Sequence, residues 1–156
     1  MSEATPFGIY LHIPYCKAKC RYCDFYSAPG ARGVPQSYVD ALLRELAKNT
    51  RRPDTLYFGG GTPTILSAGQ LDQICTAVEK NFDLSRLKEY TVEAGRPDTI
   101  DREKLRTLRR HRVTRISINP QTLNDGVLRN IGRRHTAEQF YEAFDLARRC
   151  GFCKCA

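Results

Sequence analysis

The chain has 156 residues and a net charge of +8, with 41% hydrophobic and 27% charged residues, which are ordinary values for one soluble globular domain. No apolar run approaches the length of a membrane span, and the N-terminus has no signal-peptide pattern. These features predict a cytoplasmic protein and exclude one that spans a membrane. Seven cysteines in such a chain argue for metal binding or catalysis and against disulfides.

Short apolar runs and helical stripes alternate along the chain after residues 1–7, which are expected to form a disordered lead. The predicted strands are residues 9–13, 55–58, 89–93 and 115–119. The predicted helices are residues 37–48, a segment after Ser67, residues 99–110, residues 125–131 and a segment from Thr136 as far as Gly151.

Two of these helices begin with a capping box, in which Ser67 is followed by Gln70 and Thr136 by Gln139. Cys75 lies on the apolar stripe of its helix and is expected to act as a small core hydrophobe.

The β-α rhythm repeats four times without a hairpin signal. This pattern predicts an α/β protein whose parallel strands form an open sheet or part of a β/α barrel. Functional sites in such sheets gather at the carboxyl ends of the strands.

The tail from Phe152 onward has no apolar run, so no strand is predicted there. A truncated or frameshifted end explains this tail best. An auxiliary cluster site built from Cys150, Cys153 and Cys155 is the less favoured alternative.

Three cysteines follow the first predicted strand in a C-x3-C-x2-C pattern: Cys16, Cys20 and Cys23. Thiolates this close in a loop can hold one iron–sulfur cluster, and three of them leave one iron of a four-iron cluster open. Lys17, Lys19 and Arg21 alternate with the cysteines, which predicts a loop of solvent-facing thiolates.

A structural zinc site and a set of inert core thiols are the competing interpretations of these cysteines. The zinc site needs four ligands, and His12 would have to supply the fourth from within a strand. The neighbouring cations argue against inert core thiols.

Arginines are concentrated between residues 102 and 149. They indicate either an acidic partner or solvated helix faces, and solvated faces suit most of them. A zinc-stabilised nucleic-acid module is disfavoured as a function, because the chain lacks paired cysteine ligands and an aromatic-basic recognition pattern.

Three further motifs directly follow predicted strands: Gly59-Gly60-Gly61-Thr62, Glu93 and Asn119-Pro120-Gln121. Glycines let a backbone approach a ligand closely, although tight turns use them too. Glu93 and Gln121 also have interpretations without a function: Glu93 as an exposed carboxylate at a strand end, and Gln121 as a turn residue.

The cysteine loop resembles that of the radical S-adenosylmethionine (SAM) enzymes, in which the open iron of a 4Fe-4S cluster chelates SAM. Reduction of that cluster cleaves SAM to methionine and a 5′-deoxyadenosyl radical. The ordered motifs GIYLHIPYC, CRYCDF, GGGTPT, VEAGRPDT, RISINPQTLND and IGRRHT resemble, over residues 8–152, the oxygen-independent coproporphyrinogen III oxidase family. That family includes dehydrogenase-like and haem-chaperone branches, and the EAGRPDT and INPQT segments resemble the dehydrogenase-like branch most.

The resemblance assigns roles by position. The cluster would be held by Cys16, Cys20 and Cys23, and the SAM on it would be contacted by Tyr10, Gly60 and Glu93. A second SAM would match Tyr22, Gly61, Thr62, Gln121 and Arg133. Arg133 is therefore the one arginine that we move from the solvated faces to the site, because its planar fork suits a carboxylate.

The resemblance also carries two departures. Phe25 stands where the oxidase has a further cysteine, as in the chaperone-like branch, and the later strands are missing. Residues 8–156 are therefore interpreted as a truncated radical SAM core, the first four β/α units of a partial (β/α)6 barrel.

The function implied is oxidative decarboxylation of coproporphyrinogen III to protoporphyrinogen IX, and the alternative is a haem chaperone. Expected partners are a porphyrinogen or haem and a reductant such as flavodoxin or ferredoxin, with no nucleic acid.

Overall fold

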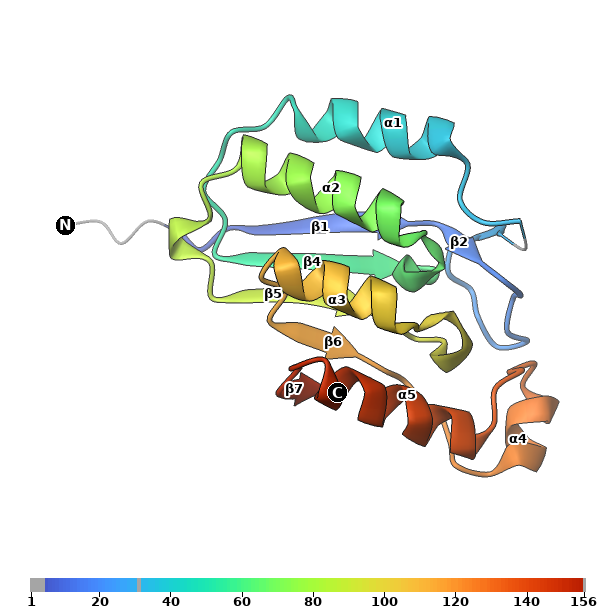
Figure 1. Cartoon of the computed structure of the whole chain (residues 1–156). Helices are drawn as coiled ribbons and strands as arrows, with labels where there is room; N and C mark the ends of the chain where they lie inside the picture. Colours follow the sequence, from blue (N-terminus) through green and yellow to red (C-terminus); the bar gives the residue numbers. More distant parts are fainter. Residues whose placement is uncertain (1–4, 31, 156) are drawn as a thin grey trace.

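The strands form one parallel sheet in the order β1-β4-β5-β6-β7 in the computed structural model, which describes residues 5–30 and 32–155 (Figure 1). The five strands are β1 Gly8–Ile13, β4 Thr55–Gly60, β5 Glu89–Glu93, β6 Arg115–Ser117 and β7 Lys154–Cys155. The predicted class, α/β with parallel β/α repeats, is confirmed. Strand β1 begins one residue earlier than expected, β4 extends two residues further, and β6 ends two residues sooner.

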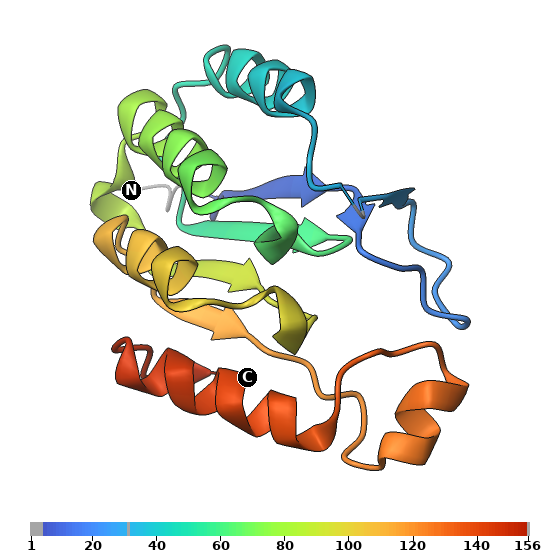
Figure 2. The ribbon, with the colours of Figure 1, turned by 45° about the vertical axis from the view of Figure 1, so that its right-hand side comes forward.

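The helices connect these strands. They are α1 Gln36–Leu46, α2 Ala68–Asn81, α3 Arg102–Arg110, α4 Asp125–Asn130 and α5 Ala137–Arg149, with 3-10 turns η1 Pro63–Ile65, η2 Leu84–Arg86 and η3 Pro97–Thr99. Figures 1 and 2 show α1, α2 and α3 along the same face of the sheet. In the described part of the chain, each of these helices lies between two strands that pair in parallel, as crossover connections require.

The core lies between the sheet and these helices. Alternate strand residues such as Leu11, Phe58, Val92 and Ile116 point into it and are buried. Burying these side chains supplies the main favourable free energy of folding. Cys75 is fully buried among them, as predicted, and burial raises the pKa of its thiol to about 12.

Both predicted capping boxes are present. The Ser67 hydroxyl accepts a hydrogen bond from the Gln70 backbone N–H, and Thr136 does the same for Gln139. Helix α3 starts three residues later than predicted, because Asp101 caps it and accepts from the Lys104 N–H, whereas residues 97–99 form a 3-10 turn.

The tail contradicts the sequence prediction. Lys154 and Cys155 pair in parallel with Arg115 and Ile116, so a fifth strand follows α5. The residues Lys154 and Cys155 do not form the apolar run that predicts a strand. They pair with β6 because the edge of β6 offers unpaired backbone groups. The expectation that the tail contains no strand was wrong for this reason.

The start of the chain differs in part from the expected lead. Residues 1–4 lie outside the described residues. Phe7 is hydrogen-bonded at both backbone groups: its N–H donates to the Asp54 carboxylate, and its carbonyl accepts from the Asp54 N–H. Among the described residues, every helix is too short or too polar to cross a bilayer.

Sequence reasoning also missed a small sheet, in which β2 Tyr15–Cys16 pairs in parallel with β3 Ala28–Pro29. This pairing closes the cysteine loop, residues 16–23, at its base. The loop therefore projects from the carboxyl end of β1 as a defined element (Figure 2).

Candidate functional site at the carboxyl ends of the strands

The unusual motifs meet at one edge of the sheet, where β1, β4, β5 and β6 end (Figure 1). A cavity of about 200 Å³ lies there, which we call the strand-end cavity. Most residues predicted for the site line it: Cys16, Cys20, Cys23, Tyr22, Gly60, Gly61, Glu93, Gln121 and Arg133. Tyr10 and Thr62 lie outside this lining. Thr62 contacts Cys16, which lines the cavity, and Tyr10 stacks on Tyr57, which is hydrogen-bonded to Glu93 in the lining.

The cysteine loop turns its sulfur atoms inward and its cations outward. Cys16 and Cys20 are buried and Cys23 is half-buried, whereas the cations that alternate with them are exposed. The expectation of solvent-facing thiolates was therefore wrong for Cys16 and Cys20. The chain turns tightly here, since the Cys23 N–H donates to the Cys20 carbonyl over 3.2 Å.

Thr62 connects the glycine segment to the cysteine loop. Its side chain is buried, and its hydroxyl lies 3.4 Å from the sulfur of Cys16. A cysteine and a threonine 46 positions apart thus form one contact at the cavity wall.

The glycine segment is packed tightly against β1 and β2, which lead into this loop. A Cβ on Gly61 would lie 2.6 Å from the Tyr15 carbonyl oxygen, and a Cβ on Gly60 would lie 2.7 Å from the His12 ring. Gly60 also has φ +108°, which side-chain-bearing residues rarely adopt. Glycine is needed here for the close packing of the β4 end against β1 and β2, in addition to any ligand.

Glu93 and Tyr10 are joined through Tyr57, a residue that sequence reasoning missed. The Tyr57 hydroxyl donates to Glu93 Oε1 over 2.5 Å, and its ring stacks on Tyr10 with a centroid distance of 6.0 Å. Burial, followed by the bond to Glu93, raises the pKa of Tyr57 well above its ordinary value. The available signal was strand alternation: Tyr10 and Tyr57 are aligned partners on neighbouring strands.

Arg133 belongs to the cavity and not to a solvated helix face. It is 8% exposed, its Nε and Nη2 donate to the Tyr22 hydroxyl, and its Nη1 donates to the Gly95 carbonyl. Burial raises the pKa of Tyr22 although the neighbouring guanidinium opposes that shift. Gln121 is exposed and has φ +65°, so a strained turn places it at the cavity.

Arg96 is a second buried guanidinium that sequence reasoning did not select. It is 6% exposed, and its Nη2 donates to the Ala18 carbonyl over 2.6 Å and to the Cys20 sulfur over 3.0 Å. The signal was its position three residues after the strand-end Glu93, in the same turn that lines the cavity.

A family model described as the Radical SAM superfamily matches residues 10–156. The chain belongs to the radical SAM superfamily. Members of this superfamily in general use SAM together with a 4Fe-4S cluster.

Two similar proteins indicate which family within the superfamily this chain resembles. The chain is 41% identical to the oxygen-independent coproporphyrinogen-III oxidase-like protein HemZ of Bacillus subtilis, covering 92% of this chain and 31% of HemZ. It is 38% identical to the haem chaperone HemW of Lactococcus lactis, covering 94% of this chain and 39% of HemW. The chain thus spans about a third of the length of these relatives, which support the coproporphyrinogen oxidase-like radical SAM family with its haem-chaperone members.

A solved structure supports the same placement. Coproporphyrinogen III oxidase, HemN, of Escherichia coli superposes with a TM-score of 0.82 at 28% identity, covering 96% of this chain and 36% of HemN. HemN is described as a radical SAM enzyme. The radical SAM fold expected for this chain is therefore confirmed.

Two kinds of metal site were considered for the cysteine loop, a zinc site and an iron–sulfur cluster. In the described residues, no group of three or more His, Cys, Asp or Glu side chains converges on a position for a single metal ion. The zinc alternative lacks such a group, and His12 Nδ1 instead lies 3.0 Å from the Tyr10 hydroxyl. A polynuclear cluster takes one thiolate at each of several irons, and Cys16, Cys20 and Cys23 all line the strand-end cavity. The residues present fit such a radical SAM cluster.

Proposed function

We propose that residues 8–156 form the core of a radical SAM enzyme of porphyrin and haem biosynthesis. The reaction is the oxygen-independent oxidative decarboxylation of coproporphyrinogen III to protoporphyrinogen IX. The observation that carries the proposal is the convergence of Cys16, Cys20 and Cys23 with the ends of β4, β5 and β6 on one cavity. The oxidase-like name of the Bacillus subtilis relative and the HemN superposition support the choice of substrate.

Three cysteines in this proposal hold the cluster and leave one iron for SAM. The bound cluster and SAM supply one-electron chemistry that starts with reductive cleavage of SAM. Glu93 offers a carboxylate to a cationic amino group, and Tyr57 keeps that carboxylate in place. Gly60 lines the cavity without a side chain, which lets a cofactor approach the backbone, and Tyr10, which stacks on Tyr57, is proposed to extend the binding surface from β1.

Arg133, Tyr22, Gly61, Thr62 and Gln121 are proposed to contact a second SAM. Arg133 suits a carboxylate because it is already buried, which limits competition from water. Its present bond to the Tyr22 hydroxyl fixes the guanidinium at the cavity wall. Four of these five residues line the strand-end cavity, whereas the role of Thr62 rests on its position in the family pattern alone.

The second candidate function is a haem chaperone that binds and delivers haem without decarboxylation. Phe25 favours it, because this residue lines the cavity, is 61% exposed and replaces the further cysteine of the oxidase. The similarity to HemW, named a haem chaperone, favours it as well.

In either case the protein is proposed to work in the cytoplasm. For the radical SAM reaction, the electron that reduces the cluster is proposed to come from a carrier such as flavodoxin or ferredoxin.

The first experiment tests for radical SAM chemistry. The protein is reconstituted anaerobically with iron and sulfide, mixed with dithionite and SAM, and assayed for 5′-deoxyadenosine by mass spectrometry. We expect product from the wild type and from Cys153→Ala, whose cysteine is exposed and directly precedes β7. We expect none from the triple variant Cys16→Ala/Cys20→Ala/Cys23→Ala. Failure of the wild type to take up iron refutes the cluster assignment.

A second experiment separates the oxidase from the chaperone. The reconstituted protein is incubated with coproporphyrinogen III, SAM and reductant, and separately with haem. Formation of protoporphyrinogen IX supports the oxidase. Stable haem binding without turnover supports the chaperone.

A further inference from the structure

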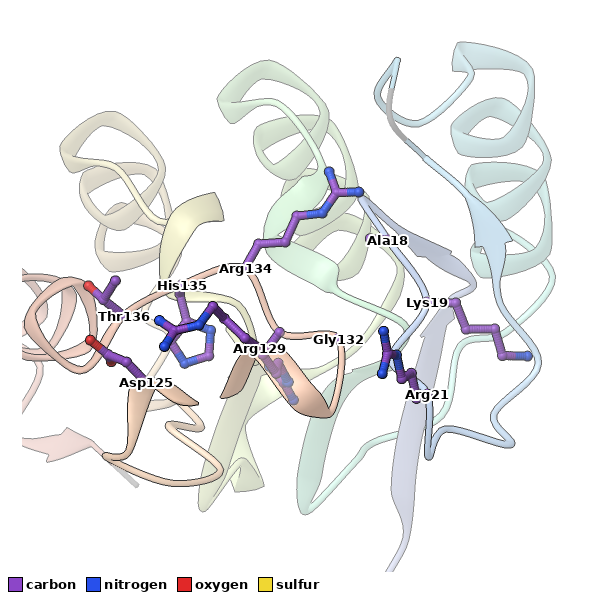
Figure 3. Close-up of a pocket in the computed structure, with 10 residues that line it drawn as sticks. Ala18, Lys19, Arg21, Asp125, Arg129, Gly132, Arg134, His135 and Thr136 are labelled. Atoms are coloured by element: carbon purple, nitrogen blue, oxygen red, sulfur yellow. The ribbon is translucent and has the colours of Figure 1, made fainter. Parts of the chain in front are cut away.

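A second cavity lies beside the cysteine loop, outside the site proposed for the cluster. Its volume is about 520 Å³, and we call it the basic cavity because Lys19, Arg21, Arg129 and Arg134 line it. Figure 3 shows these cations coming from two segments, the cysteine loop and the end of α4 with the turn that follows it. Lys19 and Arg133 line both cavities, so the two are adjacent.

The charge of the basic cavity is not neutralised within the described residues. Its four exposed cations have no carboxylate within salt-bridge distance there, in contrast to Lys17, which pairs with Asp98 at 3.2 Å. The cavity has one acidic lining residue, Asp125, and its Oδ1 accepts a hydrogen bond from the backbone N–H of Ala137. Like charges held around one concavity raise the local potential and attract anions.

Hydrogen bonds join the two segments that form the walls of the basic cavity. The Arg21 N–H donates to the Ile131 carbonyl over 3.0 Å, and Arg21 Nη1 donates to the Asn130 carbonyl over 3.2 Å. Gly132 makes the turn at this point with φ +79°, a conformation that favours glycine. The two segments that carry the cations are therefore held together before a ligand binds, which lowers the entropy cost of binding.

His135 adds an unused polar atom to this cavity. The side chain lines the cavity and is 3% exposed, and Nε2 lies 3.2 Å from the Pro120 carbonyl, so Nε2 carries the proton that it donates. Nδ1 has no hydrogen-bond partner among the described residues. With the proton on Nε2, Nδ1 is an acceptor, so it takes a hydrogen bond from a donor such as a water molecule and not from a carboxylate, and binding of an anion depends on the cations.

We propose that the basic cavity binds the carboxylate groups of a polycarboxylate ligand. Arginine suits this chemistry, because its planar fork donates two parallel hydrogen bonds to one carboxylate. The inference rests on the proposed function in one respect: the reacting part of the same ligand would face the adjacent strand-end cavity, where the cluster and SAM are proposed to bind. The binding residues Arg129 and Arg134 have no place in the cluster or SAM sites.

Binding is tested without iron, SAM or reductant, so that it is independent of radical chemistry. Coproporphyrin III serves as the probe, because it is a stable, fluorescent tetracarboxylate of the same ring size as the proposed substrate. A tetracationic N-methylpyridinium porphyrin serves as the charge-reversed comparison. Dissociation constants are measured by fluorescence titration at low salt and at high salt.

We expect Arg129→Gln and Arg134→Gln each to weaken coproporphyrin binding about tenfold, the usual size for one charge-assisted hydrogen bond. We expect high salt to weaken binding as well. The control variant Arg102→Gln/Arg106→Gln removes two exposed charges from α3, away from the cavity, and should bind like the wild type. Substituting exposed residues should leave folding intact, which circular dichroism verifies.

The proposal is overturned if the Arg129 and Arg134 variants bind like the control variant, or if the cationic porphyrin binds as tightly as the anionic one. Failure of SAM cleavage in the reconstituted enzyme would refute the proposed function and leave this binding result standing. Arginine-dependent binding in a chain that cleaves no SAM would separate the two conclusions.

Discussion

Arg96 is expected to stabilise the cysteine loop even in the absence of a cluster, and Arg96→Gln tests this. The guanidinium is 6% exposed and donates to the Ala18 carbonyl over 2.6 Å and to the Cys20 sulfur over 3.0 Å. These acceptors lie far earlier in the chain, with separations of 78 and 76 residues. Removing the guanidinium therefore removes both hydrogen bonds between the loop and the turn after β5.

The magnitude follows from the contacts. Hydrogen bonds from a charged donor contribute about 1.5–3 kcal/mol each, which gives about 3–6 kcal/mol for the pair. Burying an unpaired charge offsets part of this contribution, because desolvation costs several kcal/mol. We expect a net loss of about 2 kcal/mol in the free energy of unfolding, or roughly 30-fold in the folding equilibrium.

Equilibrium unfolding in urea measures this loss. With a denaturant slope of about 2 kcal/mol per M, the midpoint should fall by about 1 M. Hydrogen exchange should also speed up at the backbone amides of residues 18–23. Arg106→Gln is the matched control, because Arg106 is exposed on α3. Equal midpoints for the two variants would refute the reasoning, since a buried and an exposed arginine would then contribute alike.

Two further predictions concern single hydrogen bonds. Tyr57→Phe removes the hydroxyl that holds the Glu93 carboxylate, so the reconstituted protein should bind SAM about tenfold more weakly by equilibrium dialysis; unchanged binding would exclude this positioning role. The hydrogen bond from the His111 ring lowers the pKa of Asp72, so the stability that Asp72 contributes is present above its unfolded pKa of about 3.9 and is lost as the pH falls through the folded pKa. Asp72→Asn should therefore flatten the loss of unfolding free energy below about pH 4, and an equally steep acid profile would contradict this linkage.

The sequence by itself determined the parallel β/α class and the edge of the sheet at which the candidate site residues gather. Alternating apolar runs, two capping boxes and the absence of hairpin signals were sufficient, because these signals are local in the chain. The motifs at Cys16, Gly60, Glu93 and Gln121 each follow a strand, and parallel strands bring their carboxyl ends to one edge. Convergence on one cavity thus followed from topology alone.

Tertiary structure decided which residues support that site. Tyr57 reaches Glu93 across two neighbouring strands, and Arg96 reaches Cys20 across most of the chain. Such contacts depend on register and loop path, which no local pattern contains. The burial of the cysteine sulfurs is of the same kind, since the exposed cations beside them suggested the opposite.

The fifth strand and the basic cavity show the same limit. Lys154 and Cys155 pair with β6 because an unpaired edge is available beside them, although their own residue types give no strand signal. The arginines of the basic cavity are ordinary helix-face and turn residues in the sequence, and only the docking of the cysteine loop on α4 gathers them. Local pattern determines elements and strand ends, whereas the contacts between distant segments determine the chemistry around them.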